Sequence, residues 1–130
     1  MLRPPKQSAF TLIEMLIVIT LIGILISIAV PSYRQSVLKA REAVLRENLH
    51  VLRATIDQFT LDKKRAPTSL AELVAERYLR VIPRDIPGSP GWNVEYCDIL
   101  LDPEQTAPGI CDVHSGSGAV SSEGTPYSSW

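Results

Sequence analysis

Residues 9–30 read AFTLIEMLIVITLIGILISIAV, and this stretch decides the architecture of the chain. Residues 10–30 are 21 in number, almost wholly apolar, and carry a single charge, at Glu14. A helix rises 1.5 Å per residue, so this run spans about 30 Å, the thickness of the hydrocarbon core of a bilayer. The alternative is a buried core helix, but a chain of 130 residues rarely encloses a helix that is apolar all round. We therefore expect residues 10–30 to form a transmembrane helix.

The residues before this run form a short basic leader. Residues 1–9 contain Arg3 and Lys6 and no acidic residue, and Pro4 and Pro5 disfavour a helix there. The positive-inside rule places this leader in the cytoplasm and everything after Pro31 beyond the inner membrane. An ordinary secretory signal is not indicated, because no small-x-small cleavage site follows a short apolar stretch.

After Pro31 the apolar residues follow the period of an amphipathic helix over residues 32–65. The apolar stripe consists of Leu38, Leu45, Leu49, Leu52, Ile56 and Phe59, and the charged face of Arg34, Arg41, Glu42, Arg46, Glu47 and Arg53. Neither Pro nor Gly interrupts residues 32–65, so we expect one helix from about Phe10 to Lys64, kinked at most at Pro31. Its second half is expected to pack on a small C-terminal domain.

The C-terminal domain, within residues 31–130, is predicted to contain a short helix and a small antiparallel sheet. Thr68 and Ser69 open a helix over residues 69–79, with Glu72 favourably placed near its N-terminus. Residues 82–91 are rich in Pro and Gly and predict a loop. Within a β region at 92–130, strands are expected at 92–99 and 109–113, joined by a turn-rich connection at 101–108, with a possible third strand at 119–120. The fold class is thus α+β.

Charge is unevenly distributed along the chain. Residues 31–65 contain eight basic and four acidic residues, whereas residues 92–130 contain six acidic residues and neither Lys nor Arg. Such asymmetry can indicate nucleic acid or anionic lipid. Aromatic residues do not alternate with the basic ones, so we favour two faces of one subunit that attract each other or their neighbours, and we expect no nucleic-acid partner.

Two cysteines, Cys97 and Cys111, lie in the C-terminal part. An even number of cysteines in an exported domain predicts a disulfide. With His114 they could instead form a zinc site, but three ligands at these spacings match no closed four-ligand pattern. No Ser, His and Asp arrangement or pair of carboxylates indicates catalysis, so we do not expect an enzyme.

The segment Ala9-Phe10-Thr11-Leu12-Ile13-Glu14, opening an apolar run after a basic leader, resembles the type IV pilin and type II secretion pseudopilin superfamily. The segments 112–117 and 123–127 and Trp130 resemble the C-terminus of G-type major pseudopilins. The resemblance implies a structural subunit of a periplasmic pseudopilus that drives protein export across the outer membrane. A type IV pilin for adhesion, motility or DNA uptake is the alternative, and a plain single-pass membrane protein with a periplasmic binding domain is a third.

The resemblance also implies processing and partners. A membrane-embedded prepilin peptidase removes residues 1–9 by cutting between Ala9 and Phe10, and methylates the new N-terminus at Phe10. The family usually has Gly where this chain has Ala9. Because Ala is the smallest side chain after Gly, we expect cleavage that is slower or still adequate. Other copies of the chain, other pseudopilins and an inner-membrane assembly platform are the remaining expected partners.

Glu14 is expected to act in assembly. A carboxylate inside a membrane helix costs roughly 2.5–3.5 kcal/mol on insertion scales, so it needs a partner. The α-amino group of Phe10 exposed by cleavage is a cation that can neutralise it, and the resemblance implies that the pair forms between adjacent subunits. The alternative is a solvated Glu14 near the membrane interface.

Two further expectations come from the resemblance. Gly23 and Pro31 match family positions where the helix is easiest to unwind; a static kink is the alternative. Many G-type pseudopilins hold calcium in the loop before the C-terminus, and here Asp112, Ser121, Ser122 and Glu123 are the weak candidates. Calcium takes six to eight oxygen ligands, so we expect no bound cofactor, with calcium as the alternative.

Overall fold

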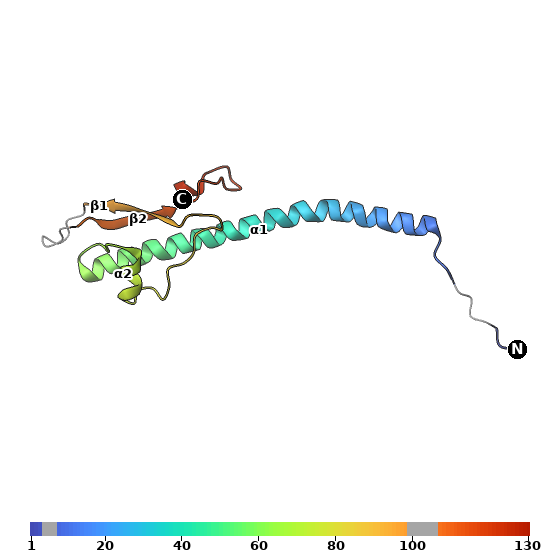
Figure 1. Cartoon of the computed structure of the whole chain (residues 1–130), viewed down its shortest axis with the longest axis horizontal. Coiled ribbons are helices and arrows are strands. Elements are labelled where there is room, and N and C mark those ends of the chain that lie inside the picture. Colours follow the sequence, from blue (N-terminus) through green and yellow to red (C-terminus); the bar gives the residue numbers. More distant parts are fainter. Residues whose placement is uncertain (4–7, 99–106) are drawn as a thin grey trace. The chain divides into compact units, whose positions relative to one another are not determined.

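The computed structural model describes residues 1–3, 8–98 and 107–130 (Figure 1). Its elements are α1 (Leu12–Lys63), α2 (Leu70–Ala75), β1 (Trp92–Cys97), β2 (Gly109–Ser115) and a 3-10 helix (Tyr127–Ser129). This confirms the expected α+β class. Pro4, Pro5 and Lys6 of the leader, and most of the connection expected at 101–108, lie outside the described residues. The chain divides into two compact units, Met1–Val37 and Leu38–Trp130, which we describe separately.

The helix of the first unit is exposed on every side. It begins at Leu12, two residues later than expected, and continues through Pro31 without a break. Large apolar side chains point outward all round, and Leu12 and Leu25 are 83% and 66% exposed. Of the described helices, α1 is the one long and apolar enough to cross a membrane. A helix with this surface requires lipid or other apolar helices around it.

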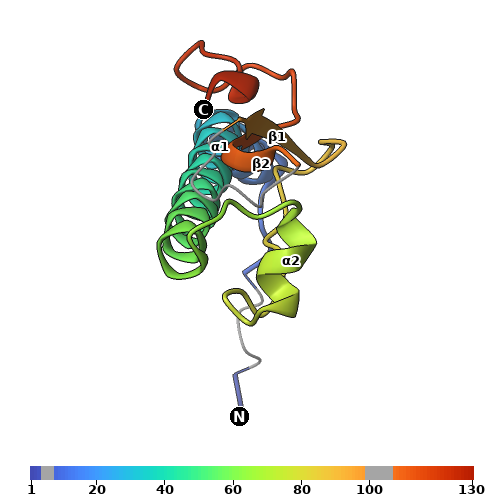
Figure 2. The same ribbon diagram turned by 90° about the vertical axis from the view of Figure 1, so that its left-hand side faces the viewer.

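The core of the second unit is built on the second half of α1. Five residues of the expected apolar stripe are at most 2% exposed: Leu45, Leu49, Leu52, Ile56 and Phe59. They cluster with Leu73 of α2, with Ile110 and Val113 of β2 and with Tyr127. Figure 2 shows β1 and β2 alongside this part of α1. The stripe prediction is wrong at Leu38, which is 37% exposed because it lies at the margin of the unit, one turn before the first buried position.

Two left-handed residues end the helices. Lys64 has φ 58° and terminates α1, close to the expected end. Ser69 caps α2 as predicted, because its side chain accepts a hydrogen bond from the Glu72 N–H. The helix expected at 69–79 is nevertheless too long, since α2 ends at Ala75. The reason is Arg77, whose φ of 63° reverses the chain so that the N–H groups of residues 78 and 79 both donate to the Leu73 carbonyl.

The sheet is a two-stranded antiparallel ribbon of β1 and β2 with a bulge between Glu95 and Tyr96. β1 ends at Cys97, earlier than predicted, and β2 extends to Ser115, two residues beyond the prediction. The third strand expected at 119–120 is reduced to one isolated bridge between Val120 and Pro126. The intervening turn is too tight for a longer pairing, since Ser121 N–H donates to the Thr125 carbonyl. The loop expected at 82–91 contains neither helix nor strand.

Candidate functional site: the N-terminal segment and the loop that closes the domain

The first turn of α1 is capped by the residue that follows Phe10. Thr11 Oγ1 accepts a hydrogen bond from Glu14 N–H at 3.2 Å, and the Thr11 carbonyl accepts from Met15 N–H at 3.2 Å. Thr11 is therefore the N-cap, and Glu14 occupies the third helical position, where an acidic side chain suits the positive end of the helix dipole. The Thr-x-x-Glu spacing is that of a capping box, which sequence reasoning missed at this helix although the pattern was visible.

The expected cleavage bond lies just outside this cap. Ala9 and Phe10 precede α1 and are both exposed, with Phe10 at 71%. A peptidase needs an extended, accessible peptide bond, and helical backbone would hide it. The cap at Thr11 thus keeps the bond between Ala9 and Phe10 free of helix.

Within the apolar run, Glu14 differs from the other polar residues. Thr20 Oγ1 donates to the Leu16 carbonyl at 2.7 Å, and Ser27 Oγ donates to the Ile24 carbonyl at 2.7 Å, so both hydroxyls are satisfied inside the helix. Among the described residues, none forms a hydrogen bond or ion pair with the Glu14 carboxylate. A charged group in an apolar segment that is unpaired within residues 1–3, 8–98 and 107–130 is suited to a partner on another chain.

A second carboxylate, Glu42, closes the C-terminal loop of the second unit. Sequence reasoning placed Glu42 on the charged face of the helix, and this is wrong: it is 4% exposed. One carboxylate oxygen accepts from Ser122 N–H at 2.6 Å and from Tyr127 O–H at 2.9 Å, and the other from Ser122 O–H at 2.5 Å. Burial alone would raise the pKa of Glu42, but these three hydrogen bonds outweigh it and lower the pKa. The spacing could have revealed this residue. Glu42 follows Leu38 by four residues and precedes Leu45 by three, which places it on the same helix face as the apolar stripe.

Comparison with known proteins decides the family. A family described as a prokaryotic N-terminal methylation motif matches residues 4–30. The type II secretion system core protein G of Klebsiella pneumoniae is 34% identical over 112 residues, which cover 77% of this chain and 78% of that protein. The chain belongs to the core protein G family of type II secretion systems. Its relative in Klebsiella michiganensis is 29% identical over 133 residues, covering 85% of this chain and 93% of that protein.

Pilins are similar over a shorter stretch. The type IV major fimbrial protein FimA of Dichelobacter nodosus is 37% identical over 60 residues, 46% of this chain and 38% of that protein. No solved structure matches. The longer coverage by the two Klebsiella proteins agrees with the G-type features of the C-terminal segment, so the chain is a G-type pseudopilin.

The four calcium candidates of this pseudopilin do not form a site in the described structure. Asp112 Oδ1 accepts from Arg53 Nε at 2.7 Å, and Glu123 pairs with Arg46 at 2.9 Å. Ser121 and Ser122 are occupied by Thr125 and Glu42, respectively. Calcium requires six to eight converging oxygens. In the described structure these four side chains are directed to other partners within the protein, and Glu42 holds the loop through Ser122.

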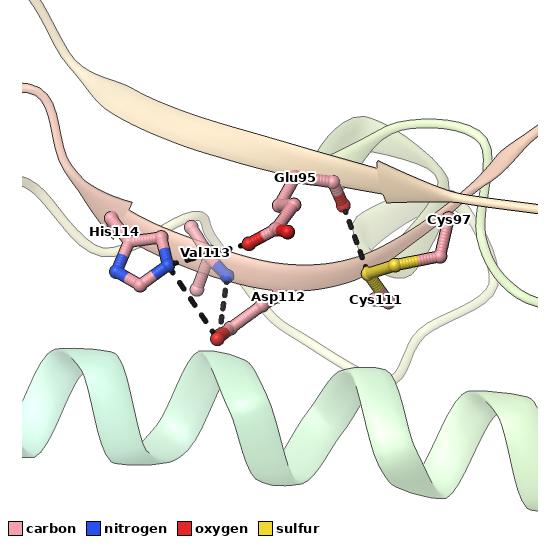
Figure 3. Close-up of a disulfide and its surroundings, with 6 residues drawn as sticks. All are labelled: Glu95, Cys97, Cys111, Asp112, Val113 and His114. Atoms are coloured by element: carbon pink, nitrogen blue, oxygen red, sulfur yellow. Dashed lines mark hydrogen bonds and ion pairs between the residues drawn. A yellow bond between two sulfur atoms is a disulfide. The ribbon is translucent and has the colours of Figure 1, made fainter.

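The two cysteines form the expected disulfide across the ribbon, shown in Figure 3. Cys97 of β1 and Cys111 of β2 are joined with their Cα atoms 5.7 Å apart. Neither thiol is therefore available to the zinc set considered with His114. The ring of His114 instead lies beside Asp112 and Glu95. Burial would raise the pKa of Asp112, but the Val113 N–H and the Arg53 guanidinium bind the carboxylate and lower it.

Proposed function

We propose that this pseudopilin is inserted in the inner membrane as a single-pass precursor, with residues 1–9 in the cytoplasm, and is then processed and polymerised into a periplasmic filament. A prepilin peptidase cuts between Ala9 and Phe10 and methylates Phe10. Residues 10–30 then pack against the same segment of other copies and of other pseudopilins on an inner-membrane platform. The role is structural rather than enzymatic.

One observation carries this proposal: a capped helix that is apolar and exposed on all sides, with one carboxylate, a turn from its start, that pairs with none of the described residues. In lipid, the backbone of residues 12–30 is satisfied by its own helix, but the Glu14 carboxylate has no such partner in the described part of the chain. The new amino group at Phe10 of a neighbouring subunit supplies the opposite charge. Pairing would fix the axial register between subunits, because a single charge in an apolar surface defines one position.

Processing can be tested separately from assembly by mass spectrometry of the membrane-extracted protein. The expected N-terminus is N-methylated Phe10, with residues 1–9 absent. Ala9→Gly is the matched variant and should be processed at least as fast, whereas Ala9→Lys should accumulate as precursor. An N-terminus at any other residue contradicts the proposed cut.

Export is tested by deleting the gene and restoring it. The proposal predicts that enzymes normally released from the cell are retained in the periplasm, while surface pili are unaffected. The similarity to FimA gives the second candidate, a type IV pilin. Loss of surface pili with normal export would favour that candidate and contradict secretion.

A further inference from the structure

A cluster of three potential metal ligands lies on the β1–β2 ribbon. Glu95 and Asp112 are register partners on neighbouring strands, and His114 follows Asp112 by two residues on β2. Residues two apart on a strand lie on the same face, so the three side chains gather on one side of the ribbon (Figure 3). Their donor atoms all lie within 4.8 Å of one another.

The two carboxylates face each other across the ribbon. Like charges directly opposite each other on an antiparallel ribbon destabilise it. Arg53 Nε and the Val113 N–H both donate to one oxygen of Asp112, Oδ1, each at 2.7 Å. This leaves Oδ2 directed at the His114 ring and free to bind a metal.

The orientation of His114 suits a metal ligand. Its Nδ1 lies 2.6 Å from the backbone oxygen of Trp130, which can only accept, and 3.5 Å from Arg53 Nη2, which can only donate; the much shorter contact places the Nδ1 proton on the Trp130 side. The other ring nitrogen, Nε2, then faces the carboxylates, 3.5 Å from Asp112 Oδ2 and 3.7 Å from Glu95 Oε2. Histidines that bind metals characteristically donate their second N–H to a backbone carbonyl or carboxylate in this way.

The spacing between the histidine and the two carboxylates fits a small cation. Bonds of about 2.0–2.2 Å in a tetrahedral zinc site put neighbouring ligand atoms roughly 3.3–3.6 Å apart. The distance from His114 Nε2 to Asp112 Oδ2, 3.5 Å, lies in that range, and a small rotation of the exposed Glu95 side chain can shorten the 3.7 Å to Glu95 Oε2. Imidazole favours zinc and related transition metals over calcium and magnesium.

We propose that Glu95, Asp112 and His114 bind a divalent transition-metal ion, zinc in the first instance. Three protein ligands leave the fourth tetrahedral position open to water or to a group from another molecule. The ion joins β1 to β2 and, through the His114 ring, fixes the C-terminal segment at Trp130. Cys97 and Cys111 of the same ribbon are joined in the disulfide, so neither thiol is available as a ligand.

The test uses the full purified chain in detergent, with the disulfide intact, stripped of metal and titrated with zinc ions alone in a calorimeter. One equivalent is expected to bind at micromolar concentration. His114→Gln should weaken binding at least tenfold, as should Glu95→Gln, whereas His50→Gln should leave it unchanged. His50 is the matched control, because it is the other histidine of the chain and is exposed on α1.

Cobalt provides a second readout, since tetrahedral cobalt absorbs strongly in the visible range and the band should vanish in His114→Gln. Three results would each overturn the proposal: no saturable zinc binding, zinc binding that is equal in the wild type and His114→Gln, or displacement of bound zinc by an equal concentration of calcium. In those cases the cluster is a polar contact between the two strands that holds no metal.

Discussion

At Glu42, one carboxylate receives three hydrogen bonds from two residues 80 and 85 positions further along the chain. The donors are Ser122 and Tyr127, so this side chain determines where the C-terminal loop lies on α1. Its folded-state pKa is below the usual value of 4.5, and a group of this kind stabilises the fold at any pH above its unfolded pKa. That contribution is lost as the pH falls through the folded-state pKa, when the carboxylate becomes protonated.

We therefore predict that Glu42→Gln costs about 1–2 kcal/mol of unfolding free energy at pH 7, since the amide cannot accept all three hydrogen bonds. The difference from the wild type should shrink between pH 5 and pH 3. Urea unfolding of the full chain, followed by the fluorescence of Trp92 and Trp130, measures it. Glu47→Gln, at an exposed position of the same helix, is the control and should change little. A Glu42→Gln deficit that stayed constant down to pH 3 would contradict the assignment.

Among the elements, the β1–β2 ribbon is short and depends on covalent support. A two-stranded hairpin alone is marginal in water, and residues 98–108 separate its strands in the sequence. The disulfide between positions separated by 14 residues closes that connection. In the chain-entropy model, a loop of about 15 residues closed by a disulfide gains about 3 kcal/mol.

Replacing both cysteines, Cys97→Ser with Cys111→Ser, is predicted to lower the unfolding free energy of the second unit by about 3 kcal/mol. Chemical denaturation measures this, and reduction of the wild type should reproduce it. Reduction of the double variant should have no effect, which controls for the reductant. Intact mass without reductant should show the wild type two protons lighter than its reduced form, and two free thiols in the exported protein would refute the pairing.

The other element with a specific expectation is the part of α1 between Gly23 and Pro31. In the single chain this part is helical throughout, as expected for a segment that must satisfy its own backbone in lipid. In a filament, neighbouring helices replace lipid, and Pro31 already lacks one helical hydrogen bond. Unwinding there lengthens the chain from about 1.5 Å towards 3.3 Å per residue.

The double variant Gly23→Ala, Pro31→Ala should therefore insert normally but form filaments with altered rise or lower stability. A methyl group at Gly23 meets no heavy atom within 4 Å, so the variant changes helix propensity without a steric clash in the subunit. Electron microscopy of the filaments measures rise directly. Unbroken helix through residues 23–31 in the wild-type filament, or unchanged rise and stability in the variant, would exclude this mechanism.

For the whole molecule, the sequence predicted the helices and the ribbon well because these are governed by local periodicity. The apolar stripe follows from the spacing of its residues, and the cap at Ser69 from the preference of serine for that position. The disulfide follows from an even number of cysteines in an exported domain. The end of α2 at Ala75 depends on one left-handed residue, Arg77, that no propensity indicates. The sequence placed Glu42 on the exposed face because its side chain is charged, although its spacing matches the apolar stripe. Its hydrogen-bond partners, Ser122 and Tyr127, lie far along the chain and could not be predicted. His114, Glu95 and Asp112 meet through strand register, which the bulge shifts and which sequence alone does not give.

The central claim is that the first turn of α1 assembles subunits through Glu14. Its most direct test is the filament yield of Glu14→Val in a reconstituted assembly assay. Thr20→Val is the matched control in the same apolar run, because the Thr20 hydroxyl is bonded within its own helix. We predict that both variants insert and lose residues 1–9, that Thr20→Val polymerises normally, and that Glu14→Val forms few or no filaments. Normal filament yield from Glu14→Val would contradict the account.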